Sequence, residues 1–178
     1  MAARRQEAST DAHLPTHVAA LVLDFDGVIS DDRVLTLQDG TEGVLESCGD
    51  GMGLELLRAA GIRVRVLSKE ANPVVTARCA KLGLEVFQRV EQKLRMLEQW
   101  CDDSGVDVED IVYVGNDVND LECIRRAGCG VVPSDAHPSV RTAADVVLTL
   151  RRWNGAAREL RATRFLGLRL TTDRRGLT

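Results

Sequence analysis

The stretch Val18-Ala-Ala-Leu-Val-Leu-Asp24-Phe-Asp26-Gly27-Val28 decides the fold class. Its first six residues form a continuous apolar run, which is typical of a strand covered on both faces. The run stops at two aspartates placed i and i+2, and a glycine that allows a sharp turn follows them. The stretch therefore predicts a buried strand that ends in two carboxylates on one face.

The same pattern recurs along the chain, with helical stretches in between. Apolar runs at Arg63–Leu67 and Ile111–Val114 each predict a further strand. Helices are predicted over residues 51–60, 72–82, 91–104, 121–127, 138–144 and 155–166. Apolar residues at helical spacing predict a core face for two of them: Met52, Leu56 and Ala59 in the first, and Leu94, Leu97 and Cys101 in the third. Strands that alternate with crossover helices predict an α/β fold with a doubly wound parallel sheet.

One segment departs from this alternation. Residues 34–38 and 41–45 flank Asp39-Gly40, a favoured two-residue turn, and therefore predict a β-hairpin. Because the hairpin is inserted directly after the first strand, it cannot join the parallel sheet and is expected to project beyond the strand ends. The sequence leaves no stretch long enough for a cap domain.

The length of 178 residues suits one domain with its own core. We expect this domain to cover residues 18–166, after a flexible polar extension over 1–17 and before a tail over 167–178. The chain is 44% hydrophobic, 28% charged and only 3% aromatic, which fits an aliphatic-packed α/β protein and argues against disorder.

Charge and cysteine content argue against several classes of protein. The formal charge of −4 gives no electrostatic basis for binding nucleic acid, and no apolar run approaches the ~18 residues of a membrane span. The five cysteines are odd in number and lack CxxC spacing, so we expect single buried thiols and neither a disulfide framework nor a zinc site. A cytoplasmic protein without nucleic-acid or membrane partners is predicted.

Ligands of doubly wound sheets bind at the carboxyl ends of the strands, so the residues there are the candidate site. Asp24 and Asp26 would repel each other unless a cation compensates, which favours a hard divalent metal. An ionised aspartate can attack phosphorus, and a second acid can protonate the leaving oxygen. The alternative is a strand-end turn that is rich in aspartate by chance.

The other predicted strand ends carry further polar residues. Ser68 could donate to a phosphate oxygen or simply cap the following helix. Lys93 opens a helix, where a cation opposes the macrodipole, so its placement suits a nearby anion; the alternative is a solvated surface lysine. The loop Gly115-Asn-Asp-Val-Asn-Asp120 gathers oxygen-bearing side chains, of which an acidic helix cap explains only one.

Together these residues resemble the four ordered motifs of the haloacid dehalogenase superfamily. The matching residues are Asp24-x-Asp26-Gly27-Val28, Ser68, Lys93 and Gly115-Asn-Asp-x-x-Asp120. The capless body, the hairpin, Asp50-Gly51-Met52-Gly53 and Asp135-Ala136-His137-Pro138 are similar to one subgroup. That subgroup contains 3-deoxy-D-manno-octulosonate 8-phosphate phosphatase, its relatives acting on nine-carbon keto-sugar acid phosphates, and phosphatase-like C-terminal domains of acylneuraminate cytidylyltransferases.

The resemblance implies a Rossmann-like haloacid dehalogenase core and a role for each matching residue. Asp24 would be the nucleophile and a metal ligand, and Asp26 the general acid and base, which also binds the metal through its carbonyl. Ser68 and Lys93 would hold the phosphoryl group. Asn116, Asp117 and Asp120 would complete a Mg²⁺ site, and Gly27, Asp50 and Glu70 would contact the substrate. The family also implies a homotetramer in which a neighbour's hairpin helps to roof the site.

Several positions depart from the family pattern, among them Gly49, which stands where relatives often have arginine. Asn116 stands where the loop usually has its first acid, and Arg89 stands where many relatives have glycine. Glu70, in Ser68-Lys69-Glu70, is more similar to the nonulosonate branch, where it could accept hydrogen bonds from the substrate; the alternative is a solvated loop acid.

The predicted function is Mg²⁺-dependent hydrolysis of the phosphate monoester of a small sugar acid, of the octulosonate or nonulosonate type, through an aspartyl phosphate. Two alternatives stay open. One is a non-catalytic oligomerisation module, which the altered Asn116 favours and the intact Asp24, Asp26, Ser68 and Lys93 oppose. The other is a phosphatase for a different small phosphorylated molecule, such as a nucleoside of specialised metabolism.

Overall fold

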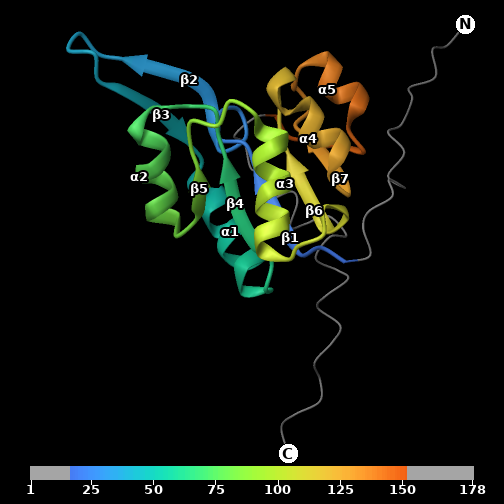
Figure 1. Cartoon of the computed structure of the whole chain (residues 1–178). Coiled ribbons are helices and arrows are strands. Elements are labelled where there is room, and N and C mark those ends of the chain that lie inside the picture. The colour runs from blue at the N-terminus through green and yellow to red at the C-terminus, as the bar shows by residue number, and fades with distance from the viewer. Residues whose placement is uncertain (1–16, 152–178) are drawn as a thin grey trace, which may run out of the picture.

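The computed structural model describes residues 17–151, which form a sheet with helices on both sides and a projecting hairpin (Figure 1). The strands are β1 (Ala20–Leu23), β2 (Ser30–Thr36), β3 (Glu42–Glu46), β4 (Arg63–Leu67), β5 (Glu85–Phe87), β6 (Ile111–Val114), β7 (Cys129–Val132) and β8 (Val146–Val147). The helices are α1 (Cys48–Ala59), α2 (Pro73–Leu82), α3 (Lys93–Ser104), α4 (Leu121–Arg126) and α5 (Pro138–Ala143). Two short 3-10 helices are η1 (Val108–Asp110) and η2 (Val118–Asp120).

The sheet has six parallel strands in the order β5-β4-β1-β6-β7-β8, which confirms the doubly wound α/β prediction. Its centre is β1, which pairs with β4 on one side and β6 on the other, so that Leu23 lies opposite both Val66 and Val114. The three predicted strands are therefore neighbours, and their carboxyl ends lie side by side.

The continuous apolar run of β1 is explained by a core on each side of the sheet. Leu21 and Leu23 belong to one cluster, together with residues of α1 and α2. Ala20 and Val22 belong to the other cluster, together with residues of α3, α4 and α5. Because successive side chains point to opposite faces, a strand between two helix layers needs apolar residues at every position.

The hairpin of β2 and β3 forms its own two-stranded sheet and projects from the upper left of the molecule in Figure 1. Its turn differs from the prediction. Leu37 N donates to Thr41 O at 2.8 Å, so three residues form the turn instead of two, and Gly40 takes a φ of +82° at its end. A type I turn followed by a left-handed glycine is a common three-residue hairpin loop.

Two predictions about buried side chains were wrong. Met52 is 60% exposed, because α1 turns Leu54 and Leu57 into the core. Cys48, at the first position of α1, is exposed, whereas the other four cysteines are buried free thiols. The helical spacing of apolar residues predicted α1 correctly but indicated the wrong face as buried, because apolar residues lie on both faces of this helix.

Several predictions fall on residues that are not described. The helix over 155–166, the tail over 167–178 and all of the extension over 1–17 except His17 lie outside the described residues. Within the part of the chain that the structure describes, no helix is long and apolar enough to cross a bilayer.

The backbone at Gly128 packs directly against the backbone of Glu109, and this contact provides a test of the fold. A Cβ atom at this position would lie 1.7 Å from the carbonyl oxygen of Glu109, and backbone atoms cannot yield as a side chain does. We expect Gly128→Ala to lower the free energy of unfolding by about 3 kcal/mol, measured by urea denaturation. Gly43→Ala, where no atom lies within 4 Å of the added Cβ, is the control; equal stability of the two variants would contradict the packing described here.

Candidate active site

A buried lysine lies at the centre of the candidate site. Lys93 is the first residue of α3, and its Nζ lies 2.8 Å from Asp24 Oδ1 and 2.8 Å from Asp120 Oδ1. Burial alone lowers the pKa of Lys93, but the charges of Asp24 and Asp120 outweigh it and raise the pKa above its usual value. The predicted anion near this helix terminus is therefore a pair of carboxylates.

Asp24 follows β1 directly, and its backbone N–H donates to Val114 O at 2.9 Å, which fixes it against β6. Its Oδ1 accepts from Lys93 and from Phe25 N at 2.7 Å, whereas no donor among residues 17–151 contacts Oδ2. Burial, and next the charge of Asp120, raise the pKa of Asp24 well above its usual value, although Lys93 opposes them. One oxygen of this carboxylate is thus held in place and the other has no donor.

Asp120 is fully buried and its carboxylate is saturated with protein donors. Oδ1 accepts from Lys93 and from the hydroxyl of Tyr113, each at 2.8 Å. Oδ2 accepts from the backbone N–H groups of Asn116 at 2.9 Å and Asp117 at 3.3 Å. A carboxylate offers about four lone-pair directions, and all are used here. These contacts do not support the metal-ligand role predicted for Asp120.

Asp26 lies half-buried on the same turn, two residues beyond Asp24. The Ser30 hydroxyl donates to its Oδ1 at 3.4 Å. Burial, and next the charge of Glu70, raise the pKa of Asp26. A carboxyl group with a raised pKa can keep a proton closer to neutral pH, which suits a general acid. Gly27 follows with a φ of +73°, a backbone conformation that favours glycine and makes the turn.

Ser68 follows β4 and is completely buried. Its Oγ accepts from Glu70 N at 3.0 Å, which leaves its own proton to donate elsewhere. The carboxylate of Glu70 turns back onto its own loop, where its Oε1 accepts from the backbone N–H groups of Ala71 and Asn72. The helix cap is therefore Asn72, whose Oδ1 accepts from Val74 N, and the capping alternative considered for Ser68 is wrong.

The loop between β5 and α3 joins Ser68 to Lys93. Val90 N donates to Ser68 O at 3.1 Å and Arg89 N donates to Glu70 O at 3.2 Å. Arg89 adopts a φ of +62°, in the left-handed region that favours glycine. This conformation explains why a glycine would suit the position where the sequence has Arg89.

One polar atom beside the carboxylates has no partner. Asn116 Oδ1 is buried and accepts no hydrogen bond, whereas the backbone of Asn116 is fixed at both ends by Asp120 and by His137 N. A buried acceptor without a donor is costly, and a cation would satisfy it. The Asp24 carboxylate, the backbone carbonyl of Asp26 and this amide oxygen are all hard oxygen donors, of the kind that fits Mg²⁺.

The structure shows no side-chain contact between this group and two of the predicted residues, as far as residues 17–151 describe them. Asp117 caps the η2 helix, where its Oδ1 accepts from Val118 N, and its side chain is exposed. Asp50 lies in α1, and its side chain lies outside the described residues. Among residues 17–151, no three His, Cys, Asp or Glu side chains gather as a metal site, so the donor set depends on Asn116.

Sequence reasoning missed Tyr113. The residue lies in β6, where an apolar run hides a hydroxyl group that contacts Asp120. Burial, and next the charge of Asp120, raise the pKa of Tyr113 well above its usual value, so it stays a hydrogen-bond donor. A lone tyrosine within a buried strand was the available signal, because a buried hydroxyl needs a partner.

The fold and the site define a class: a parallel α/β protein with an aspartate nucleophile candidate at a strand end and, within residues 17–151, no cap domain. A family model for haloacid dehalogenase-like hydrolases matches residues 62–160. The 3-deoxy-D-manno-octulosonate 8-phosphate phosphatase of Escherichia coli K12 is 30% identical over 145 residues, which are 81% of this chain and 77% of that enzyme.

Solved structures agree with this result. A haloacid dehalogenase family hydrolase from Streptomyces avermitilis is 43% identical with a TM-score of 0.82, and the match covers 86% of this chain and 88% of that one. The octulosonate phosphatase of Moraxella catarrhalis, solved with magnesium, phosphate and the sugar acid, is 27% identical with a TM-score of 0.80, over 89% and 95% of the two chains.

This chain belongs to the haloacid dehalogenase-like hydrolases and is a phosphoric monoester hydrolase related to 3-deoxy-D-manno-octulosonate 8-phosphate phosphatase. Phosphatases of this family use a divalent metal. The relatives are enzymes, which argues against the non-catalytic oligomerisation module.

Proposed function

We propose that the protein hydrolyses the phosphate monoester of a small sugar acid with Mg²⁺, through an aspartyl phosphate on Asp24. The observation that carries the proposal is that the two carboxylate oxygens of Asp24 differ in their hydrogen bonding: Oδ1 is held by Lys93 and Phe25, while Oδ2 has no donor among residues 17–151. An oriented carboxylate oxygen at the end of the central strand is placed to attack. The substrate class is supported by the relatives named for an octulosonate 8-phosphate.

In the first half-reaction, Asp24 Oδ2 attacks phosphorus and the bond between phosphorus and the sugar oxygen breaks. Asp26, whose pKa is raised, gives its proton to the leaving oxygen. In the second half-reaction, Asp26 takes a proton from water as that water attacks the aspartyl phosphate. Inorganic phosphate leaves and Asp24 is restored. Ser68 and Lys93 hold the phosphoryl oxygens during both steps.

Asp24, the backbone carbonyl of Asp26 and the amide oxygen of Asn116 would hold the Mg²⁺. When bound, Mg²⁺ supplies positive charge that neutralises the phosphate and lowers the pKa of Asp24. We assign Asp120 to a positioning role, because its four hydrogen bonds fix Lys93 and the loop that carries Asn116. We assign Asp117 to capping, and Glu70 to contact with the sugar near Asp26.

Asp24→Asn tests the chemistry. We expect phosphate release to fall by roughly 10⁴-fold or more, because an amide cannot form the aspartyl phosphate. Release would be measured with Mg²⁺ on a panel that contains an octulosonate 8-phosphate, a nonulosonate 9-phosphate and a nucleoside monophosphate. Chelation should silence the wild type, and beryllofluoride should inhibit it stoichiometrically.

The control for that variant is Asp103→Asn, since Asp103 is an exposed residue of α3. It should keep wild-type rates. Activity retained by Asp24→Asn would rule out the mechanism, and a preference for the nucleoside monophosphate would replace the sugar acid by the alternative substrate class.

Asn116 tests the metal site. Because ligand charge tunes affinity for hard cations, Asn116→Asp should lower the Mg²⁺ concentration for half-maximal activity by up to about tenfold. Asn116→Ala should raise it. Asp117→Ala should leave it unchanged, and Asp120→Ala should lower the turnover rate, because Lys93 loses a partner. A Mg²⁺ requirement that is unaffected by Asn116→Ala would exclude Asn116 as a ligand.

We also propose a homotetramer in which the hairpins of neighbouring subunits cover the sites. Four apolar side chains of the hairpin are half or more exposed: Val34 at 56%, Leu35 at 67%, Leu37 at 50% and Leu45 at 66%. Both ends of β3 are anchored to α2 and its capping residue: Glu46, at the base of the hairpin, pairs with Arg78, and Asn72 Nδ2 donates to Glu42 Oε2 at 2.6 Å near the turn. A fixed ribbon with an apolar surface suits an interface, and closed symmetry would complete it.

Light scattering after size exclusion tests the assembly. We expect four copies for the wild type and fewer for Leu35→Glu with Leu45→Glu, because each change places a charge in the interface. Thr36→Glu, on an exposed residue of the same hairpin, is the matched control and should stay assembled. A monomer with full activity at the assay concentration would refute the shared roof.

A further inference from the structure

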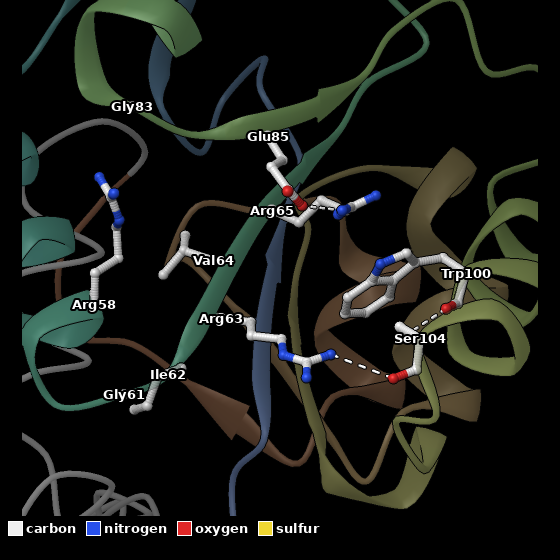
Figure 2. Close-up of a pocket in the computed structure, with 10 residues that line it drawn as sticks. All are labelled: Arg58, Gly61, Ile62, Arg63, Val64, Arg65, Gly83, Glu85, Trp100 and Ser104. Carbon is white, nitrogen blue, oxygen red and sulfur yellow. Dashed lines mark hydrogen bonds and ion pairs between the residues drawn. The ribbon is translucent and has the colours of Figure 1, made fainter.

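A cavity opens at the end of the sheet opposite the candidate site (Figure 2). It measures about 530 Å³ and lies at the amino ends of β4 and β5, beside the last turn of α3. Ser68 follows the carboxyl end of the same β4 strand, so the length of the sheet separates the two sites. The volume is within the usual range of about 300–1,000 Å³ for small-molecule sites.

The lining of this cavity is basic in an acidic protein. Arg58, Arg63 and Arg65 line it together with a single acid, Glu85, so the lining carries an excess of two positive charges, whereas the whole chain has a formal charge of −4. Glu85 pairs with Arg65 alone. No carboxylate among residues 17–151 forms an ion pair with Arg58 or Arg63.

Helix capping uses only part of the hydrogen-bonding capacity of these arginines. Arg58 Nη1 donates to Leu82 O at 3.0 Å and Arg63 Nη1 donates to Ser104 O at 3.4 Å, which caps the ends of α2 and α3. Each guanidinium has five N–H donors, so most remain available. Arg65 Nε is buried and has no hydrogen-bond partner at all.

Aromatic rings fix the orientation of Arg65. Its guanidinium carbon lies 4.4 Å from the ring centroid of Phe87 and 4.8 Å from that of Trp100. Figure 2 shows the indole of Trp100 between the arms of Arg63 and Arg65, on the same side of β4. A guanidinium held in plane loses little entropy when it binds a carboxylate or phosphate with two hydrogen bonds.

We propose that this cavity binds a small organic anion that carries a phosphate or carboxylate group. The oxyanion would accept hydrogen bonds from Arg63 and Arg65 at the edge of the Trp100 indole that lies between them, and its organic body would extend toward Arg58. The cavity is larger than an inorganic phosphate needs, which leaves room for that body. This site is separate from the phosphatase site and does not depend on the substrate proposed for it.

The test uses Trp100 as a local probe. The chain has two tryptophans, Trp100 and Trp153, so in a Trp153→Phe background the emission comes from the cavity alone. The full chain would be titrated, without Mg²⁺, with inorganic phosphate, a hexose phosphate and citrate. We expect a saturable change in emission, with tighter binding of an organic anion than of inorganic phosphate. If the hexose phosphate binds more tightly than citrate, the cavity recognises a phosphate group. If citrate binds more tightly, the cavity recognises a carboxylate group.

Arginine variants in the same background separate this cavity from the phosphatase site. Arg63→Gln should raise the dissociation constant about tenfold, and Arg63→Lys should restore part of the affinity by restoring the charge. Arg33→Gln, an exposed arginine of β2, is the matched control and should bind like the parent. Circular dichroism and the urea midpoint verify that each variant is folded. Absence of a saturable signal, or equal affinity of Arg63→Gln and the control, would overturn the proposal.

Discussion

The buried ammonium group of Lys93 is the interaction on which the site depends. Burying a charge costs several kcal/mol unless oppositely charged and hydrogen-bonded groups surround it. Here Asp24 and Asp120 supply the opposite charge and the hydrogen bonds. The three residues come from different parts of the chain: Asp24 from the turn after β1, Lys93 from the start of α3 and Asp120 from η2. These three segments can meet only when β1 and β6 are paired and α3 is docked. The catalytic geometry is therefore a direct outcome of the fold.

The same triad leaves the site short of positive charge. Two carboxylates share one ammonium group. Burial is the main reason why the pKa values of Asp24 and Asp26 are both raised, and the charge of a neighbouring acid adds to it, Asp120 for Asp24 and Glu70 for Asp26. The buried Oδ1 of Asn116 has no hydrogen-bond partner among residues 17–151. An amide at this position adds a ligand without adding another negative charge, so the altered loop keeps its coordinating oxygen while it limits the repulsion. A cation and an anionic substrate then balance the site together.

Much of this could be predicted from the sequence, because local rules and strand-end chemistry agreed. The central strands, Lys93 at a helix start and the helix that begins around Pro73 follow from patterns within a few residues. The structure was needed where the answer depends on distant partners. Asp120 reads as a metal ligand in its loop, and only the approach of Tyr113 and Lys93 shows that its oxygens are occupied.

Other features were too short or too symmetric to predict. The strands β5 and β8 have three and two residues, which is too short for an alternating pattern to be recognised. The core face of α1 could not be selected because Met52 and Leu54 are equally apolar. The positive φ of Arg89 could be seen only in the structure, because nothing in the neighbouring sequence indicates this conformation at an arginine.

The shortness of β5 and β8 has a further consequence, because these two strands form the edges of the sheet. An edge strand offers unpaired N–H and C=O groups that can recruit another chain. Three residues at one edge and two at the other offer too few such groups for stable pairing between molecules. The sheet thus resists fibril-like growth in the direction of its hydrogen bonds, even though β1, β4 and β6 are made of the aliphatic residues most prone to it.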